Sequence, residues 1–453
     1  MLRSSIVLAL AAVAAISAAP IVGRSSHAAA DGLRPATLER TAAYSPARAS
    51  AAQVKINHID TVLTVFLDRT GEVVETRSIK VLSEKAVRAA ARQVATYIDG
   101  VENLEVLAAY TEKSDGTRLA VAPDRILARD AAVDASDGVY LIDQKALTVF
   151  YSHVSVGDTV VLKTRLRTRS ATFPDQFVTQ FLYSRSISPT TASLKVIPAE
   201  EPHEIPAPGS TIRIVAPKEL DLHVGVYGPG VTDEVTNDEG NTTHHITFET
   251  TLEPSDLEGQ GSPLDRDPHI LVSTFKDFDQ LGRAYWAAFS PQTKVTPEIQ
   301  ALADEITKGI EDRRAQAKAI SSWVKREIRG QALLSATGRE VTTNSAAKIL
   351  GERYGACTEH VALAASLLAA KGISAEVVLV NLGEVSALPE PPTLAYFNHI
   401  ILYLPEFGVF DDPTWPVQFG TLVPQETNKP ALIVSAERGR IERTPARDAV
   451  KSF

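Results

Sequence analysis

Cys357 is the only cysteine among the 453 residues of this chain, and it stands directly before a long apolar pattern. His399 follows on an alternating strand pattern, and Asp411 and Asp412 follow on the next strand. A thiol, an imidazole and a carboxylate in this order are the groups that a cysteine acyl-transfer enzyme requires. A single cysteine cannot form an internal disulfide. The residues therefore predict nucleophilic chemistry at Cys357.

The thiol lies at the predicted start of a helix over residues 358–370. Apolar residues occupy nearly all sides of this pattern, which predicts a helix buried on most faces, and Gly372 provides its end. The positive end of the helix dipole lowers the pKa of a thiol, and its free N–H groups can hold a developing oxyanion. We expect Gly355 and Ala356 to leave room for a substrate backbone.

The turn before the aspartates decides which of them reaches His399. A two-residue loop after residue 404 would pair His399 directly with Asp412, and a four-residue loop would make Asp412 its diagonal neighbour on the same face. An odd-numbered loop would bring Asp411 to that face instead. Even loops are the simpler case, so we expect Asp412.

These assignments predict a mechanism. Cys357 attacks an amide carbonyl, His399 takes the thiol proton and passes it to the leaving amine, and Asp412 holds the imidazole tautomer. An amine as second nucleophile gives transamidation, and water gives hydrolysis. We expect no cofactor and no metal. His360, one helical turn after the cysteine, is interpreted as a structural or supporting residue.

These residues resemble the bacterial transglutaminase-like superfamily, whose core is a papain-like cysteine fold. The resemblance rests on the glycine before the nucleophile, on Gly372-Ile373 and on Asp412-Pro413-Thr414. It implies a catalytic triad of Cys357, His399 and Asp412. Relatives commonly have an acidic residue before the cysteine and a basic-acidic pair after it, where this chain has Ala356 and Thr358-Glu359, so substrate preference and activation are expected to differ.

The part of the chain before this module has strand patterns. A hairpin is predicted from about residue 60 to 75, and Ser83 is expected to cap a short helix through about Ile98. On the strand over residues 160–169, alternate positions are basic: Lys163, Arg165, Arg167 and Arg169. This stripe is interpreted as a solvated face, with a dock for an acidic ligand as the alternative. The region resembles an N-terminal β-rich domain of unknown function found in exported bacterial proteins.

The predicted fold class is α+β, with a β-rich N-terminal region of one or two β-sandwich-like domains followed by a papain-like, transglutaminase-like α+β domain. The predicted parts are a signal peptide (1–30), a linker (31–55), an N-terminal β-rich domain (56–188), a second β-rich segment (189–275), the catalytic domain (276–416) and a tail that packs on it (417–453).

Residues 4–22 carry no charge and are rich in alanine, which is typical of a signal peptide; an uncleaved membrane anchor is the alternative. We therefore expect an exported protein, periplasmic or extracellular, whose mature chain does not span a membrane. The net charge of −9 argues against nucleic acid as the main partner. The expected partner is a protein or peptide substrate, with a component of the cell envelope as a further class.

The sequence thus supports two hypotheses of different kinds. The first is an exported thiol enzyme that performs acyl transfer on protein or peptide amides, as a transamidase or as a cysteine peptidase or amidase. The second is a non-catalytic protein that uses the same fold to bind a peptide or a cell-envelope polymer. The complete set of three candidate side chains favours the enzyme.

Overall fold

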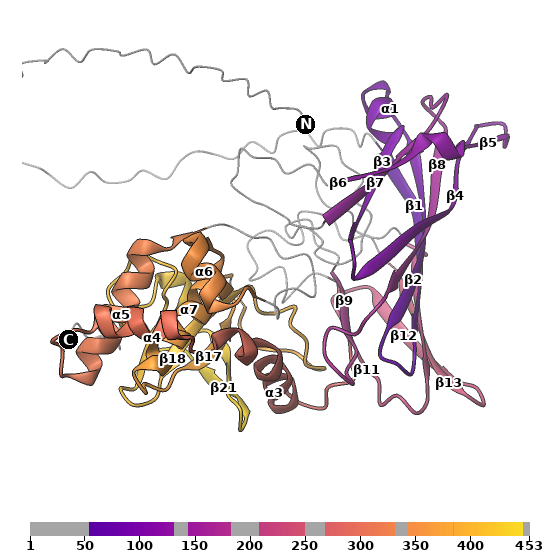
Figure 1. Cartoon of the computed structure of the whole chain (residues 1–453). Helices are drawn as coiled ribbons and strands as arrows, with labels where there is room; N and C mark the ends of the chain where they lie inside the picture. Colours follow the sequence, from indigo (N-terminus) through magenta and orange to yellow (C-terminus); the bar gives the residue numbers. More distant parts are fainter. Residues whose placement is uncertain are drawn as a thin grey trace, which may run out of the picture. The chain divides into compact units, whose positions relative to one another are not determined.

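The computed structural model describes residues 54–130, 144–182, 208–249, 268–330, 343–383 and 385–446. Over these ranges, sheets dominate up to residue 273, and a mixed α/β domain follows (Figure 1). This confirms the predicted α+β class with a β-rich N-terminal region. The predicted signal peptide and residues 31–53 of the predicted linker lie outside the described residues.

An eight-stranded sheet is the centre of the N-terminal region, in the order β12-β13-β10-β1-β2-β8-β4-β5. β1 and β10 pair in parallel, and every other neighbouring pair in this sheet is antiparallel. It therefore combines strands from residues 56–188 with strands from residues 189–275. The bounds are β1 Val54–Val65, β2 Gly71–Val81, β4 Glu102–Glu112, β5 Arg118–Ala120, β8 Thr159–Thr168, β10 Thr211–Pro217, β12 Val231–Asn237 and β13 Asn241–Phe248.

Two three-stranded sheets cover parts of this large sheet. One has the order β3-β7-β6 and shares a core with the large sheet that includes Leu147 and Leu162; the other has the order β11-β14-β9 and shares a core that includes Ile214 and Ile270. Packing of sheet on sheet over an apolar core is a sandwich-like arrangement. The bounds are β3 Arg92–Ile98, β6 Ile126–Asp130, β7 Gln144–Phe150, β9 Val178–Leu182, β11 His223–Tyr227 and β14 His269–Ser273.

The helix predicted after Ser83 is shorter than expected. α1 covers Glu84–Ala90 only, and the Ser83 side chain makes no capping hydrogen bond. Residues 92–98, predicted as helix, form β3 because they pair along their whole length with β7. Pairing with a distant strand overrides local helix propensity here, and that partner was not apparent from the local pattern.

The basic stripe on β8 lies on the solvated side of its strand. Leu162 and Leu166 are buried, whereas Arg165 is partly exposed and forms ion pairs with Glu72 and Glu105. The guanidinium of Arg167 stacks on an aromatic ring. These contacts favour the interpretation as a solvated outer face.

The C-terminal domain packs helices on an antiparallel sheet with the order β19-β18-β17-β20-β21. Residues 417–453 therefore contribute two strands to this sheet. The helices are α3 Phe278–Phe289, α4 Pro297–Ile306, α5 Arg313–Glu327, α6 Ala346–Glu352 and α7 Cys357–Ala370; the strands are β17 Glu376–Val380, β18 His399–Leu404, β19 Val409–Asp411, β20 Pro430–Val434 and β21 Gly439–Arg443.

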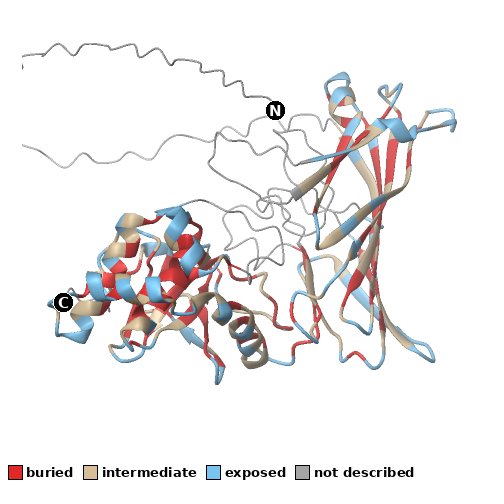
Figure 2. Ribbon diagram, in the orientation of Figure 1, coloured by how far each residue is buried: buried red, intermediate tan, exposed pale blue. Residues whose placement is uncertain are grey.

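Helix α7 is the most buried helix of this domain. Its residues from Glu359 to Ala364 are all buried (Figure 2), and the helix contacts α4, α5, α6 and β18. The side chains of Thr296 and Asp312 cap α4 and α5. Among the described residues, no helix has the length and apolar character needed to cross a membrane.

Candidate active site

Cys357 is the first residue of α7 and is half-buried. The loop before it is held by a short parallel ladder between β15 (Arg329–Gly330) and β16 (Tyr354–Gly355). The carboxylate of Glu359 accepts hydrogen bonds from the Ala356 N–H and from the Thr358 hydroxyl, both at 3.0 Å. The start of the helix, where Cys357 lies, is therefore fixed.

Gly355 makes space for a protein side chain and not, as expected, for a substrate backbone. A Cβ built on Gly355 would lie 2.4 Å from the Cβ of Glu359, so the absence of a side chain makes space for Glu359. Because this volume is already filled by the protein, it is not room for a substrate backbone. Gly355 instead allows the capping carboxylate to reach the Ala356 N–H.

His360 lies one turn after the cysteine and is turned away from the other candidate residues. Its Nδ1 lies 2.8 Å from the carbonyl oxygen of Ala356, and its Nε2 lies 3.3 Å from that of Ile328. The ring is 1% exposed. It connects the beginning of α7 to the end of α5, which supports the interpretation as a structural residue.

The turn between β18 and β19 has four residues. Leu404 pairs with Val409, and Leu402 pairs with Asp411. If this register is continued by one residue, Asp412 lies opposite Ile401 and is the diagonal neighbour of His399. The structure therefore adopts the four-residue alternative, with Asp412 and not Asp411 on the face of the imidazole.

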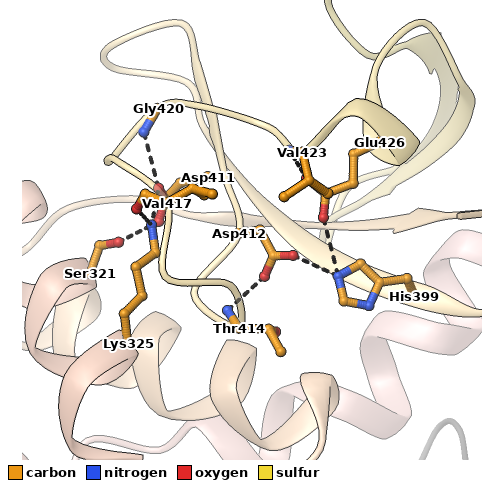
Figure 3. Close-up of polar contacts among 10 residues, drawn as sticks. All are labelled: Ser321, Lys325, His399, Asp411, Asp412, Thr414, Val417, Gly420, Val423 and Glu426. Carbon is orange, nitrogen blue, oxygen red and sulfur yellow. Dashed lines mark hydrogen bonds and ion pairs between the residues drawn. The ribbon is translucent and has the colours of Figure 1, made fainter. Parts of the chain in front are cut away.

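The imidazole of His399 and the carboxylate of Asp412 form a hydrogen bond of 2.7 Å between Nε2 and Oδ2 (Figure 3). The second oxygen of Asp412 accepts the Thr414 N–H at 2.7 Å. Because Nε2 is engaged by Asp412, Nδ1 is the ring nitrogen left for the thiol. The structure thus joins His399 to Asp412 directly, and Cys357 is among the groups that raise the pKa of this imidazole.

The protonation of the His399 imidazole follows from its surroundings. Burial acts to lower its pKa, but the interactions with Asp412, Cys357 and Glu426 outweigh burial and raise the pKa to about 12. For Asp412, burial acts to raise the pKa, and the interactions with His399 and Glu426 lower it below the ordinary value. The pair therefore favours an imidazolium beside a carboxylate.

Asp411 belongs to a separate buried cluster on the other side of the strand (Figure 3). Its carboxylate accepts hydrogen bonds from the Ser321 hydroxyl at 2.6 Å, from the Lys325 ammonium at 2.9 Å and from the Gly420 N–H at 3.0 Å. Lys325 also donates to the carbonyl of Val417. This cluster ties the loop that carries Asp412 to helix α5.

Glu426 is a residue of the site that the sequence did not reveal. It lies in the short 3-10 turn Pro424–Glu426, is fully buried, and places Oε1 3.4 Å from Nε2 of His399. Burial and the nearby Asp412 raise the pKa of Glu426 to about 7, against the opposing influence of His399. One nitrogen of His399 and one oxygen each of Asp412 and Glu426 lie within 4.8 Å of one another, so the three groups form one buried cluster.

Two exposed aromatic residues, one close to His399 and one close in sequence to Cys357, were also not anticipated. Trp415 is 41% exposed, and its ring centroid lies 6.5 Å from that of His399. Tyr354, which precedes the cysteine by three residues, is 45% exposed. Large exposed apolar side chains beside a reactive group are suited to hold an apolar part of a ligand.

Two family models match the chain. Residues 300–393 match the transglutaminase-like superfamily, and residues 68–254 match a domain of unknown function with solved structure (DUF3857). The first match includes Cys357 and ends before His399. We found no match among functionally curated proteins.

A solved structure named a "putative protease", from Parabacteroides distasonis ATCC 8503, is similar over 87% of this chain and 72% of that chain, with a TM-score of 0.64 and 17% identity. This likeness establishes the fold. A "putative cysteine protease" from Cytophaga hutchinsonii aligns over 80% of each chain at 10% identity, with a TM-score of 0.20. An M1 zinc metallopeptidase from Deinococcus radiodurans aligns over 49% of this chain and 42% of its own, at 13% identity and a TM-score of 0.25. These two scores are too low to support an argument.

Proposed function

We propose that this chain, which carries a transglutaminase-like domain behind a DUF3857 domain, is a thiol enzyme that transfers the acyl group of protein or peptide amides through Cys357. The observation that carries the proposal is the orientation of His399. Its Nε2 is held by Asp412 at 2.7 Å, which leaves Nδ1 for the thiol at the start of α7. A buried carboxylate that orients an imidazole toward a nucleophile is the arrangement used in acyl transfer.

The first half of the reaction forms a thioester. The Cys357 thiolate attacks the amide carbonyl carbon, and the carbonyl oxygen takes up the negative charge near the first N–H groups of α7. The His399 imidazolium then gives its proton to the amide nitrogen as the carbon–nitrogen bond breaks, and an amine leaves. The acyl group remains on the sulfur.

The second half releases the acyl group. His399, now neutral, accepts a proton from water or from an amine as that nucleophile attacks the thioester carbonyl. The carbon–sulfur bond breaks and the thiolate is restored beside the imidazolium. Water gives a carboxylic acid, which is hydrolysis, and an amine gives a new amide, which is transamidation.

The proposal also includes where the enzyme acts and what it binds. The uncharged, alanine-rich residues 4–22 support export, so a protein or peptide outside the cytoplasm is the proposed substrate, a cell-envelope protein included. The exposed side chains of Trp415, near His399, and Tyr354, three residues before Cys357, provide apolar surface that suits a peptide with apolar side chains.

The test is a comparison of products. The purified full chain is incubated with extract of the cell envelope and a fluorescent primary amine, and products are identified by mass spectrometry. New termini indicate hydrolysis, and amine incorporation indicates transfer. Both must disappear in Cys357→Ala and His399→Ala and persist in Arg165→Gln, whose side chain lies in the N-terminal sheet. Products that remain in Cys357→Ala would contradict the proposal.

A second measurement separates an enzyme from a binding protein. The rate at which iodoacetamide alkylates Cys357 is followed against pH. Appreciable alkylation near pH ~6 that is lost in His399→Ala indicates a thiolate paired with an imidazolium. A rate that follows an ordinary thiol with a pKa of ~8.5 indicates a non-catalytic binding protein instead.

A further inference from the structure

Glu426 is a second buried carboxylate at the same nitrogen of the imidazole. Its Oε2 accepts the N–H of Val423 at 3.0 Å, and its Oε1 lies 3.4 Å from Nε2 of His399 (Figure 3). The residue is fully buried. Because Glu426 contacts the group that would transfer protons, its own protonation state bears on the reaction.

The proton on Nε2 of His399 cannot serve both carboxylates, and Oε1 of Glu426 is left without a hydrogen-bond donor. Nε2 of His399 carries at most one proton, and this proton points at Asp412 over 2.7 Å. Within the described part of the chain, Oε1 of Glu426 has no hydrogen-bond partner. A buried carboxylate oxygen without a donor is unfavourable, and a proton on that oxygen removes the penalty because it turns an acceptor into a donor.

We propose that Glu426 is a positioning residue that rests in its protonated form and donates a hydrogen bond to the carboxylate of Asp412. Asp412 then divides its hydrogen-bonding capacity between the His399 imidazole and the Glu426 hydroxyl. This inference deepens the proposed function and rests on it.

The protonated state of Glu426 has a consequence for proton transfer. If both carboxylates were ionised, two negative charges would surround Nε2 and hold the imidazolium proton too firmly. His399 must release a proton to the leaving amine and later take one from the second nucleophile, and both steps are most efficient when its pKa is not far from the working pH. A neutral Glu426 limits the negative charge at Nε2 to that of Asp412.

The electrostatic surroundings support this assignment. Burial raises the pKa of Glu426, Asp412 raises it further, and His399 opposes both, which leaves the carboxyl group partly protonated near neutral pH. Within the described residues, His399 and Asp412 are the titratable groups that act on Glu426, and Cys357 acts on the other side of the imidazole. A raised pKa of this carboxyl group favours its protonated form.

Infrared difference spectroscopy tests the protonation directly. Spectra of the full chain and of Glu426→Gln are recorded from pH 5 to pH 9. Glutamine keeps an acceptor for the Val423 N–H and a donor for Asp412, so the arrangement is preserved without a titratable group. We expect the difference spectrum to contain the C=O band of a carboxylic acid at low pH, replaced by carboxylate bands as the pH rises. Carboxylate bands at every pH would overturn the proposal.

The alkylation of Cys357 provides a readout of the effect on the thiol. We expect the wild-type alkylation rate to show a step of about threefold over the pH range in which Glu426 ionises. A step of this size is expected if the ionisation of Glu426 changes the pKa of the Cys357–His399 pair by ~1 unit. The step should be absent in Glu426→Gln, whereas the acidic limb due to the Cys357–His399 pair should remain. Superimposable profiles for the two proteins would overturn the proposal.

These readouts do not depend on turnover. If no product forms with any substrate, the proposed function fails, yet the infrared band and the alkylation profile still decide the state of Glu426. If products form and the two pH profiles coincide, the proposed function stands and the role of Glu426 is rejected. Glu426→Ala, which removes the donor, should lower kcat, and recovery of kcat by Glu426→Gln distinguishes positioning by the hydrogen bond from loss of the fold.

Discussion

Asp411 and Asp412 are adjacent in the chain and equally buried, at 1% and 0% exposure, but their surroundings differ. Asp411 faces the ammonium of Lys325, with 2.9 Å between Nζ and Oδ1. Asp412 faces an imidazole, whose charge changes during acyl transfer. One carboxylate thus pairs with a group that takes no part in the proposed proton transfers, and the other pairs with a group that gains and loses a proton in them.

The difference follows from strand geometry. Neighbouring residues at the end of β19 point to opposite sides, so Asp411 reaches helix α5 and Asp412 reaches His399. The Asp411 cluster holds the loop in place through Lys325 and Gly420. The loop so held presents Asp412 to the imidazole. We infer that the first carboxylate contributes mainly to stability and the second mainly to chemistry.

The largest expected effect is on activity, in Asp412→Asn. An amide at this position can hold the wrong imidazole tautomer, and the loss of the negative charge leaves the imidazolium without its main partner, so we expect kcat/KM to fall by about 10⁴-fold. The measurement is the rate of product formation with the substrate found by the product comparison. Retention of activity within about tenfold would show that Asp412 does not orient His399 for catalysis.

The next effect is on stability, in Lys325→Met. The substitution leaves Asp411 buried without a cation, which is expected to lower the free energy of unfolding by about 3–5 kcal/mol in urea titrations. Arg326→Met is the matched control, because this neighbouring residue on α5 forms an exposed pair with Glu327 and should change stability by less than ~1 kcal/mol. Equal effects of the two substitutions would reject the structural role of the Asp411 cluster.

A pH series of unfolding measurements sharpens the comparison between the two carboxylates. The pKa of Asp412 is lowered in the folded protein, so its stabilising contribution is complete above its ordinary value of ~3.9 and is lost as the pH falls through its folded value. The pKa of His399 is raised to about 12, so its contribution is complete below ~6.5 and is lost as the pH rises toward the folded value.

The two contributions overlap between about pH 4 and pH 6.5. We therefore expect the difference in unfolding free energy between wild type and Asp412→Asn to be greatest in this window and to shrink toward acid and toward alkaline pH. The deficit of Lys325→Met should not follow this pH profile, because Lys325 pairs with Asp411 and the imidazole pairs with Asp412. A pH-independent deficit in Asp412→Asn would contradict the coupling between Asp412 and His399.

The sequence predicted the parts of the site that depend on local patterns. The apolar run after Cys357 indicated the buried helix α7, and the alternation around His399 indicated β18. The choice between Asp411 and Asp412 depended on the length of one turn, which the sequence left open among three cases.

The parts that escaped prediction depend on contacts between distant segments. Glu426 lies in a short turn without periodicity, and its burial becomes visible only when the segment folds back on β18. The local pattern of the residues in β3 predicts helix, because the strand they pair with, β7, follows only about fifty residues later. The sequence predicted that Gly355 leaves room for a substrate backbone. In the structure, the side chain of Glu359, four residues later, turns back on the loop and fills this space.

The smallest expected effect concerns a third kind of charged group, the exposed ion pairs of the N-terminal sheet. Arg165 lies 3.2 Å from Glu105 and 3.7 Å from Glu72, with 42% of its side chain exposed. Water and salt screen such pairs, so Arg165→Gln should change the free energy of unfolding by less than ~1 kcal/mol.

The same variant should leave product formation unchanged, and the small loss of stability should vanish in high salt, as unfolding in urea with and without added salt will reveal. A loss that persists in high salt would mean that the basic stripe of β8 is more than a solvated face. In that case, solvent exposure alone would not explain why the ion pairs of Arg165 contribute less to stability than those of the buried Asp411 and Asp412. The chemical identity of each carboxylate's partner would then have to explain the difference.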